Sequence, residues 1–241
     1  IAACLEDLRP SLEMLRRYPP QVEPERLTGA GAAMARAVLD TGDPWLTPMA
    51  AVAGTVADAA ADFLFAQGAA EKVTANNGGD IALRLAPGQS LGLGVLYDLE
   101  RGGVDRVVRM SAEKGVGGVA TSGLGGRSLT TGIASGVTVF SRRCAQADAL
   151  ATLLADRSCI DSPAVHTRLA GELDPDSDIA GLPVVVAVDP LGREEKERAL
   201  DQVLREAEAQ YRRGNLLACI ATVQGVTVTY DPNGILEENI T

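Results

Sequence analysis

Apolar positions along the chain repeat first at helical spacing, then in short strand-like runs, and finally in both patterns by turns. Residues 47–68 illustrate the helical pattern: Thr47 is a natural N-cap, Pro48 suits the first turn, and Gly68 suits the position just past the C-terminus. On the same grounds helices are predicted over residues 2–17, 29–40, 47–68, 144–157 and 193–214.

Runs rich in valine, isoleucine and leucine predict strands over residues 72–75, 80–85, 90–99, 104–110, 132–141 and 184–189, and one or two more over 216–230. Clustered strands flanked by helices predict an α+β fold with a mostly antiparallel sheet. We expect residues 1–241 to form one domain, with N-terminal helices in 1–43, a motif-bearing core in 44–155, and a strand–helix–strand part in 156–241.

Composition narrows the function classes. The net charge of −10 and the 3% aromatic content argue against a nucleic-acid partner, which favours a basic face and rings for stacking. No stretch reaches the roughly 18 unbroken apolar residues of a membrane span. The four cysteines form no CxxC pair and His166 is the single histidine, which argues against a structural zinc site. Scattered cysteines of this kind predict a reduced, cytoplasmic protein.

The segment "GVGGVATSGLGGRS", residues 115–128, is unusually rich in glycine. Gly115, Gly117 and Ala120 spell GxGxxA, but polar residues precede it and no helix can follow, so the dinucleotide-binding fingerprint does not apply. Two interpretations stay open. The segment is either an anion-binding turn, whose N–H groups and Arg127 meet a phosphate, or a bend between two strands.

Three short motifs, "NNGGDI", "GVATSG" and "ADALAT", occur in this order along the chain. Together they resemble motifs of the ApbE-like superfamily, whose best-known members are magnesium-dependent FAD:protein FMN transferases. "AVAGTVAD" is also similar to the family's Lys-Gly-x-x-x-Asp helix, with Gly54 and Asp58 at the matching separation. The resemblance covers about residues 44–155 and implies an ApbE-like, T-fold-related fold.

The resemblance also implies a site. Its metal ligands for Mg²⁺ would be the side chains of Asp148 and Thr152 and a backbone carbonyl near Ala50, and oxygen donors at i, i+4 spacing suit a hard cation. The residues implied to hold the flavin nucleotide, FAD or FMN, are Asn77, Gly78, Gly79, Asp80, Thr121, Ser122 and Gly123, with Arg127 beside them for a phosphate. Structural alternatives stay open: Asp148 complements a helix dipole, Thr152 lines the edge of the core, and Asp80 is a turn residue.

The sequence departs from the family at two chemical groups, which indicates a divergent branch. The family's lysine is Ala53 here, and its His-x-x-Asp-Pro segment has no counterpart, which argues against flavin transfer by the family's chemistry. Two hypotheses follow. The protein is an enzyme acting on a flavin or another small-molecule nucleotide with altered chemistry, or it is a non-catalytic binding or scaffold module that keeps the fold.

Other polar residues have plain interpretations. Asp58 and Asp62 lie one helical turn apart, away from the apolar stripe, and predict a solvated face. "DPDSD", residues 174–178, lacks the glycine and the distal glutamate of an EF-hand loop and predicts a surface turn. His166 is expected to be an ordinary surface or packing residue.

Overall fold

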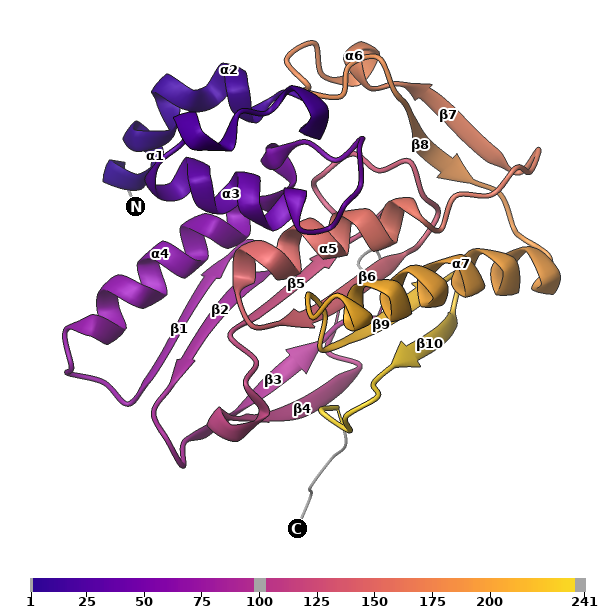
Figure 1. Ribbon diagram of the computed structural model, residues 1–241. Helices are drawn as coiled ribbons and strands as arrows, with labels where there is room; N and C mark the ends of the chain where they lie inside the picture. The colour runs from indigo at the N-terminus through magenta and orange to yellow at the C-terminus, as the bar shows by residue number, and fades with distance from the viewer. Residues whose placement is uncertain (1, 98–102, 237–241) are drawn as a thin grey trace.

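The centre of the computed structural model, which describes residues 2–97 and 103–236, is a six-stranded sheet in the order β1-β2-β5-β6-β9-β10 (Figure 1). Every neighbouring pair in it is antiparallel. Two further antiparallel pairs, β3 with β4 and β7 with β8, stand apart from it. The strands are β1 (Lys72–Asn77), β2 (Asp80–Leu85), β3 (Ser90–Val95), β4 (Arg106–Ser111), β5 (Gly118–Ser122), β6 (Gly136–Ser141), β7 (Val165–Leu169), β8 (Pro183–Val188), β9 (Ala218–Val223) and β10 (Val226–Tyr230).

Helices flank the sheet, as the sequence predicted, so the α+β expectation is confirmed. Helices α4, α5 and α7 lie on one face, and α3 packs outside α4 and α5 (Figure 1). The α-helices are α1 (Ala2–Leu8), α2 (Leu12–Leu15), α3 (Gly29–Leu39), α4 (Val52–Ala66), α5 (Cys144–Asp156), α6 (Ala170–Leu173) and α7 (Arg193–Arg212). Short 3₁₀ turns are η1 (Arg9–Ser11), η2 (Pro19–Gln21), η3 (Pro24–Arg26), η4 (Pro48–Ala51) and η5 (Ala112–Lys114).

Strands β6 and β9 are buried on both faces because alternate side chains enter different cores. Val137 and Val139 of β6 join the core beneath the helices, whereas Phe140 joins the core that includes Met110 of β4. Strand β9 also contributes alternate side chains to these two cores, and all six of its residues are buried. Such strands read as continuous apolar runs, which is why the sequence predicted them well.

The glycine-rich segment supplies a strand that the sequence analysis did not predict. β5 pairs with β2 and β6 in the middle of the sheet, and Gly118 lies where the first turn of α5 crosses it. A Cβ built at Gly118 would overlap the backbone of Arg143 and Cys144. Glycine is needed here because a helix end and a strand come into backbone contact.

Replacing Gly118 with alanine is therefore expected to destabilise the protein by at least about 1–3 kcal/mol, the usual cost of overpacking a core. Chemical denaturation measures this loss. Gly181→Ala is the matched control, because no atom lies within 4 Å of a Cβ built at that position. Equal stability of the two variants would contradict this account of the glycine.

Several predicted boundaries shift for physical reasons. The helix expected over residues 2–17 is α1, a 3₁₀ turn and α2, since Pro10 cannot donate the helical hydrogen bond. The helix expected over 47–68 starts as η4 before α4 begins. Strand β7 was not predicted, because four of its five side chains are exposed and show no apolar alternation. Residues 98 and 99 of a predicted strand lie outside the described residues.

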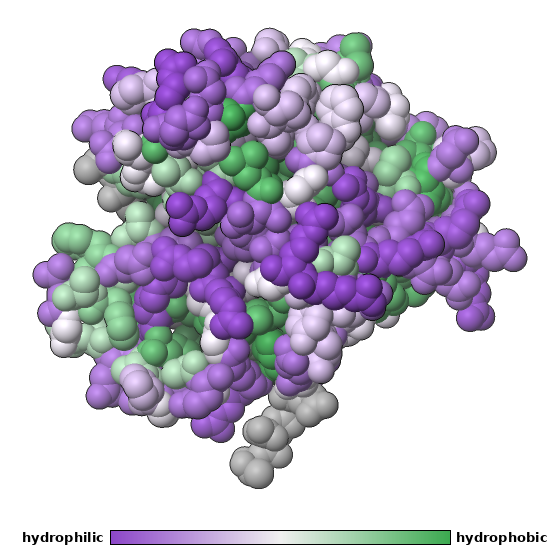
Figure 2. All heavy atoms as spheres, viewed as in Figure 1, coloured by the Kyte–Doolittle hydropathy of each residue, from purple (hydrophilic) through white to green (hydrophobic). Residues whose placement is uncertain are grey.

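Helix α4 qualifies the prediction that no segment is long and apolar enough for a membrane. Together with η4 it forms one such segment within the described chain, Pro48–Ala66, of which 39% is buried inside the protein. The helix packs on β1, β2 and α5, as a core helix does. Phe63 and Leu64 of α4 are exposed. Figure 2 shows hydrophobic colour at the left edge, on the side where α4 ends in Figure 1, and hydrophilic colour across α7.

All four cysteines are free. The cytoplasmic location inferred from their scattered positions stays a prediction.

Candidate functional site

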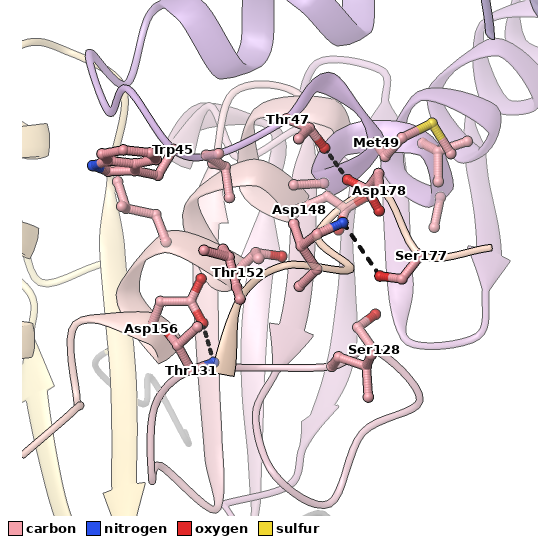
Figure 3. Close-up of a pocket in the computed structure, with 18 of the residues that line it drawn as sticks. Trp45, Thr47, Met49, Ser128, Thr131, Asp148, Thr152, Asp156, Ser177 and Asp178 are labelled. Carbon is pink, nitrogen blue, oxygen red and sulfur yellow. Dashed lines mark hydrogen bonds between the residues drawn. The ribbon is translucent and has the colours of Figure 1, made fainter. Parts of the chain in front are cut away.

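A cavity of about 590 Å³ lies beside α5 and is walled by segments from every part of the chain (Figure 3). The loop before α4 contributes Trp45, Thr47 and Ala50, and β2 contributes its first residue, Asp80. Other walls are the loop of residues 127–131, one face of α5, and the segment between α6 and β8. The site depends on tertiary contacts between segments more than one hundred positions apart.

One face of α5 provides the polar wall. Asp148, Thr152 and Asp156 follow at i, i+4 and i+8, and all three line the cavity. The sequence identified the first two, and the structure adds Asp156. Its carboxylate accepts hydrogen bonds of 2.8 Å from the Thr131 N–H and the Thr130 hydroxyl, and burial raises its pKa. Asp156 thus holds the loop opposite the helix.

Asp148 is fixed by the start of α4. Its Oδ2 accepts a 2.8 Å hydrogen bond from the N–H of Gly54, and a Cβ at that glycine would lie only 2.8 Å from the Asp148 Cβ. Within the described residues Asp148 has no ion pair with a cation. Burial, followed by the negative charge of Asp80, raises its pKa well above the ordinary value. The site holds an acidic group whose charge the surrounding side chains do not neutralise.

Asp80 faces the same cavity from the sheet. It starts β2 directly after the turn of Gly78 and Gly79, whose φ angles of 73° and 117° favour glycine. Burial raises the pKa of Asp80 to about 6, and the positive charge of Arg127 opposes that rise. Arg127 also donates a 3.2 Å hydrogen bond to the Gly78 carbonyl, so the glycine-rich segment and the "NNGGD" turn meet at the cavity.

Five predicted residues therefore converge: Ala50, Asp80, Arg127, Asp148 and Thr152 all line one cavity. The Thr152 hydroxyl makes no hydrogen bond to another described residue, so its oxygen is available.

The other predicted site residues do not line the cavity, and their contacts explain why. The Asn77 amide donates to the Ala53 carbonyl at 3.2 Å, and the N–H of Gly79 donates to the Asn76 side chain at 3.0 Å. Gly78 and Gly79 thus shape the hairpin turn.

The segment Thr121–Gly123 likewise belongs to the sheet. The Thr121 hydroxyl pairs with that of Thr138 at 2.9 Å, and Ser122 is in register with Val137. Gly123, at φ 146°, lies against the Ala134 carbonyl. A Cβ at Gly123 would meet this carbonyl at 2.8 Å, so packing against the neighbouring loop by itself accounts for the glycine. These residues stay ligand contacts by prediction only.

A segment between α6 and β8 closes the cavity, which the expectation of a plain surface turn for residues 174–178 did not anticipate. The Thr47 hydroxyl donates to the carboxylate of Asp178, and Arg16 donates to the backbone carbonyl of Asp176. Figure 3 shows Ser177 and Asp178 facing Asp148 across the cavity. No local pattern could have revealed a contact that joins residues 131 positions apart in sequence.

The lining is strongly acidic. Seven aspartates and two arginines contribute to it, and neither a lysine nor a histidine is among the lining residues of the described chain. Within that part of the chain no three His, Cys, Asp or Glu side chains gather as a metal cluster. A cation here would need neutral oxygens as well as carboxylates, such as the Thr152 hydroxyl and the Ala50 carbonyl.

Neither a lysine nor a histidine, the two residue types that the resembling motifs contain and this sequence lacks there, is among the lining residues of the described chain. Ala53 lines the cavity where the resembling motif has its lysine. His166 lies on β7, half exposed and 2.9 Å from the exposed Asp189 carboxylate, and it is not among the lining residues. Of the two expectations for His166, a surface or a packing residue, the structure shows the surface position.

Comparison with known proteins places this arrangement in a family. The family model described as "AbpE bacteria" matches residues 1–229. A UPF0280 protein from Methanopyrus kandleri is 36% identical over 149 residues, covering 60% of this chain and 58% of that protein. Another from Methanocaldococcus jannaschii is 37% identical over 112 residues, covering 46% and 44%. The chain thus spans about half the length of these relatives.

Among solved structures, the flavin transferase ApbE from Vibrio cholerae matches with a TM-score of 0.42 and 16% sequence identity, covering 80% of this chain and 52% of that one. The family model covers nearly the whole sequence. The three motifs and the antiparallel sheet flanked by helices agree with this match. The chain belongs to the AbpE bacteria family and is a member of the ApbE-like superfamily.

Proposed function

We propose that the cavity binds a flavin or another nucleotide together with a divalent metal ion. The observation that carries the proposal is the pair Asp80 and Asp148, two carboxylates on one cavity, each with a pKa raised by burial and neither in an ion pair within the described chain. Losing their protons there is costly, and a bound cation would offset that cost. The metal ligands predicted from the sequence, Asp148, Thr152 and the Ala50 carbonyl, belong to residues that line this same cavity.

The donors fit a hard cation such as Mg²⁺. The Asp148 carboxylate keeps one oxygen that is not bonded to Gly54, and Thr152 keeps a free hydroxyl one helical turn away. The Ala50 carbonyl would be a third oxygen ligand. Mg²⁺ prefers few carboxylates and often binds through phosphate oxygens, so the ligand itself would complete the coordination.

The charge of the cavity supports binding of the nucleotide as a metal complex. A phosphate facing seven aspartates would be repelled, because each close carboxylate costs Coulomb energy in a partly buried site. When bound, the metal would neutralise phosphate charge and polarise a phosphorus–oxygen bond. Arg127 adds a forked cation on the same wall.

A non-catalytic binding module is the second candidate. It is favoured because Ala53 occupies the position of the family's lysine and His166 does not line the cavity. Any proton transfer in this cavity would depend on the aspartates. We also propose that residues 1–241 act as one unit, since the parts 1–43, 44–155 and 156–241 all contribute lining residues.

Calorimetric titration with FAD, FMN and ATP, each with Mg²⁺ or with EDTA, tests the function. We expect at least one of these ligands to bind with Mg²⁺, and its affinity to fall at least about tenfold in EDTA, a difference of about 1.4 kcal/mol. Riboflavin, which lacks phosphate, is the control and should show no dependence on the metal. Binding that is equal with and without Mg²⁺ would contradict the metal site.

A further inference from the structure

Trp45 stands out at the mouth of the cavity because it is large, aromatic and 62% exposed. It is the single tryptophan of the chain. Figure 3 shows its ring edge-on at the side of the cavity away from Ser177 and Ser128, with α5 between. An exposed ring that also lines a cavity leaves one flat apolar surface available to a ligand.

The loop that carries Trp45 is held in place before any ligand arrives. The backbone N–H of Trp45 donates a 2.8 Å hydrogen bond to Asp43 Oδ1, which also accepts one of 3.0 Å from the backbone N–H of Leu46. The other oxygen of Asp43 pairs with Arg157 at 2.6 Å. The rings of Tyr18 and Trp45 pack in a T-shaped arrangement, with a centroid distance of 5.7 Å and an interplanar angle of 75°. A ring that stands on a fixed backbone and packs against Tyr18 loses little conformational entropy on binding.

The aromatic ring and the proposed metal ligands come from different segments of the lining. The potential metal ligands Asp148 and Thr152 belong to α5, whereas Trp45 belongs to the loop before η4. A ligand with a charged phosphate and a neutral planar ring has two chemically different parts to place. Repulsion by the aspartates disfavours the phosphate without a cation but does not act on an uncharged ring.

We propose that Trp45 is a stacking platform for the planar ring of the bound nucleotide, a flavin or a purine, and so determines specificity for ring-bearing ligands. The proposal rests on the function proposed above, in which the phosphate end of the same ligand is held through the metal. Stacking of a planar ring on an aromatic side chain contributes enough free energy to change the binding affinity markedly. It does not require one particular ring, because every planar ring has a face that can stack.

The test compares Trp45→Ala and Trp45→Phe with the unaltered protein by calorimetric titration in Mg²⁺. The probes are FMN, ADP and ring-free pyrophosphate. We expect Trp45→Ala to weaken binding of FMN, ADP or both by about 10- to 100-fold, leave pyrophosphate unchanged, and be largely rescued in Trp45→Phe. FMN and ADP distinguish a flavin from a purine. Phe63→Ala is the matched control, because Phe63 is 67% exposed but does not line the cavity.

The remaining outcomes contradict the stacking role of Trp45. They also show whether the proposed nucleotide and metal binding fails with it. Unchanged FMN and ADP affinity in Trp45→Ala removes the stacking role while nucleotide binding stands. Equal losses for FMN, ADP and pyrophosphate show that Trp45 only supports the loop. If the unaltered protein binds pyrophosphate but neither nucleotide, the ring specificity and the nucleotide assignment both fail. If it binds none of the three probes, the metal–phosphate site fails as well.

Discussion

Asp148→Asn is expected to abolish metal-dependent nucleotide binding while the fold remains intact. The substitution keeps the shape of the side chain but removes the charge that a divalent cation requires. Losing a group that only supports a metal ligand costs roughly 10- to 100-fold in affinity, so loss of a ligand should cost more than about 100-fold. Titration of FMN or ATP with Mg²⁺ measures the change. Asp189→Asn, at an exposed carboxylate outside the cavity, is the control.

The same variant should gain stability in metal-free buffer, with a defined dependence on pH. Burial and the charge of Asp80 raise the folded-state pKa of Asp148 above its usual 3.8, so the folded state holds this proton more tightly than the unfolded state. Stability from the protonated carboxyl is therefore present at low pH and is lost as the pH rises through the folded-state pKa. Asparagine does not incur that loss.

Thermal unfolding in EDTA at pH 4 and pH 8 tests this second effect. We expect Asp148→Asn to melt above the unaltered protein at pH 8 and close to it at pH 4. A variant that loses thermal stability and still binds the nucleotide with Mg²⁺ would show that Asp148 serves the helix and not a metal. The two measurements therefore separate the functional from the structural interpretation.

Sequence reasoning succeeded where neighbours in space are neighbours along an element. Helical periodicity puts Asp148 and Thr152 on one side of α5, and the structure places both on the cavity. The buried strands β6 and β9 were recognisable because continuous apolar runs leave few alternatives. The family motifs added Ala50 and Asp80, whose meeting with α5 no local pattern encodes.

Long-range contacts account for what was missed. No sequence pattern indicates that Trp45 lines a cavity. Residues 174–178 are held at the same cavity by contacts with distant residues such as Thr47 and Arg16. The glycine-rich segment was ambiguous because the need for Gly118 arises from the backbone at the start of α5, which lies against β5. These features depend on packing between elements, which hydropathy patterns do not specify.

Asp58 is the clearest correction. Helical spacing predicted a solvated face, but its side chain is 5% exposed and pairs with Arg84 of β2 at 2.7 Å. Its second oxygen accepts a 3.0 Å hydrogen bond from the N–H of Ala145, in the first turn of α5. An acidic group at a helix N-terminus satisfies free N–H groups and favours the helix dipole. Here the cap comes from α4, so it positions the helix that carries Asp148.

Asp58→Ala is accordingly expected to cost about 3–5 kcal/mol of unfolding free energy, because it leaves the buried Arg84 without its buried carboxylate partner. Arg84 is 13% exposed and would keep only Asp62, which it contacts at 2.5 Å. Urea denaturation measures the loss. Asp62→Ala is the matched control, since Asp62 is 45% exposed and also contacts Arg143. Exposed pairs contribute about 0–1 kcal/mol, so this variant should stay near the unaltered protein.

The double variant Asp58→Leu/Arg84→Met distinguishes an unpaired charge from a lost helix cap. Replacing both members of a buried ion pair by apolar groups of similar size is often neutral or stabilising, so most of the stability should return if Arg84 is the source of the cost. If the double variant stays as unstable as Asp58→Ala, the bond to Ala145 carries the effect. In that case metal-dependent binding should fall too, because α5 would begin without the group that holds its first turn against α4.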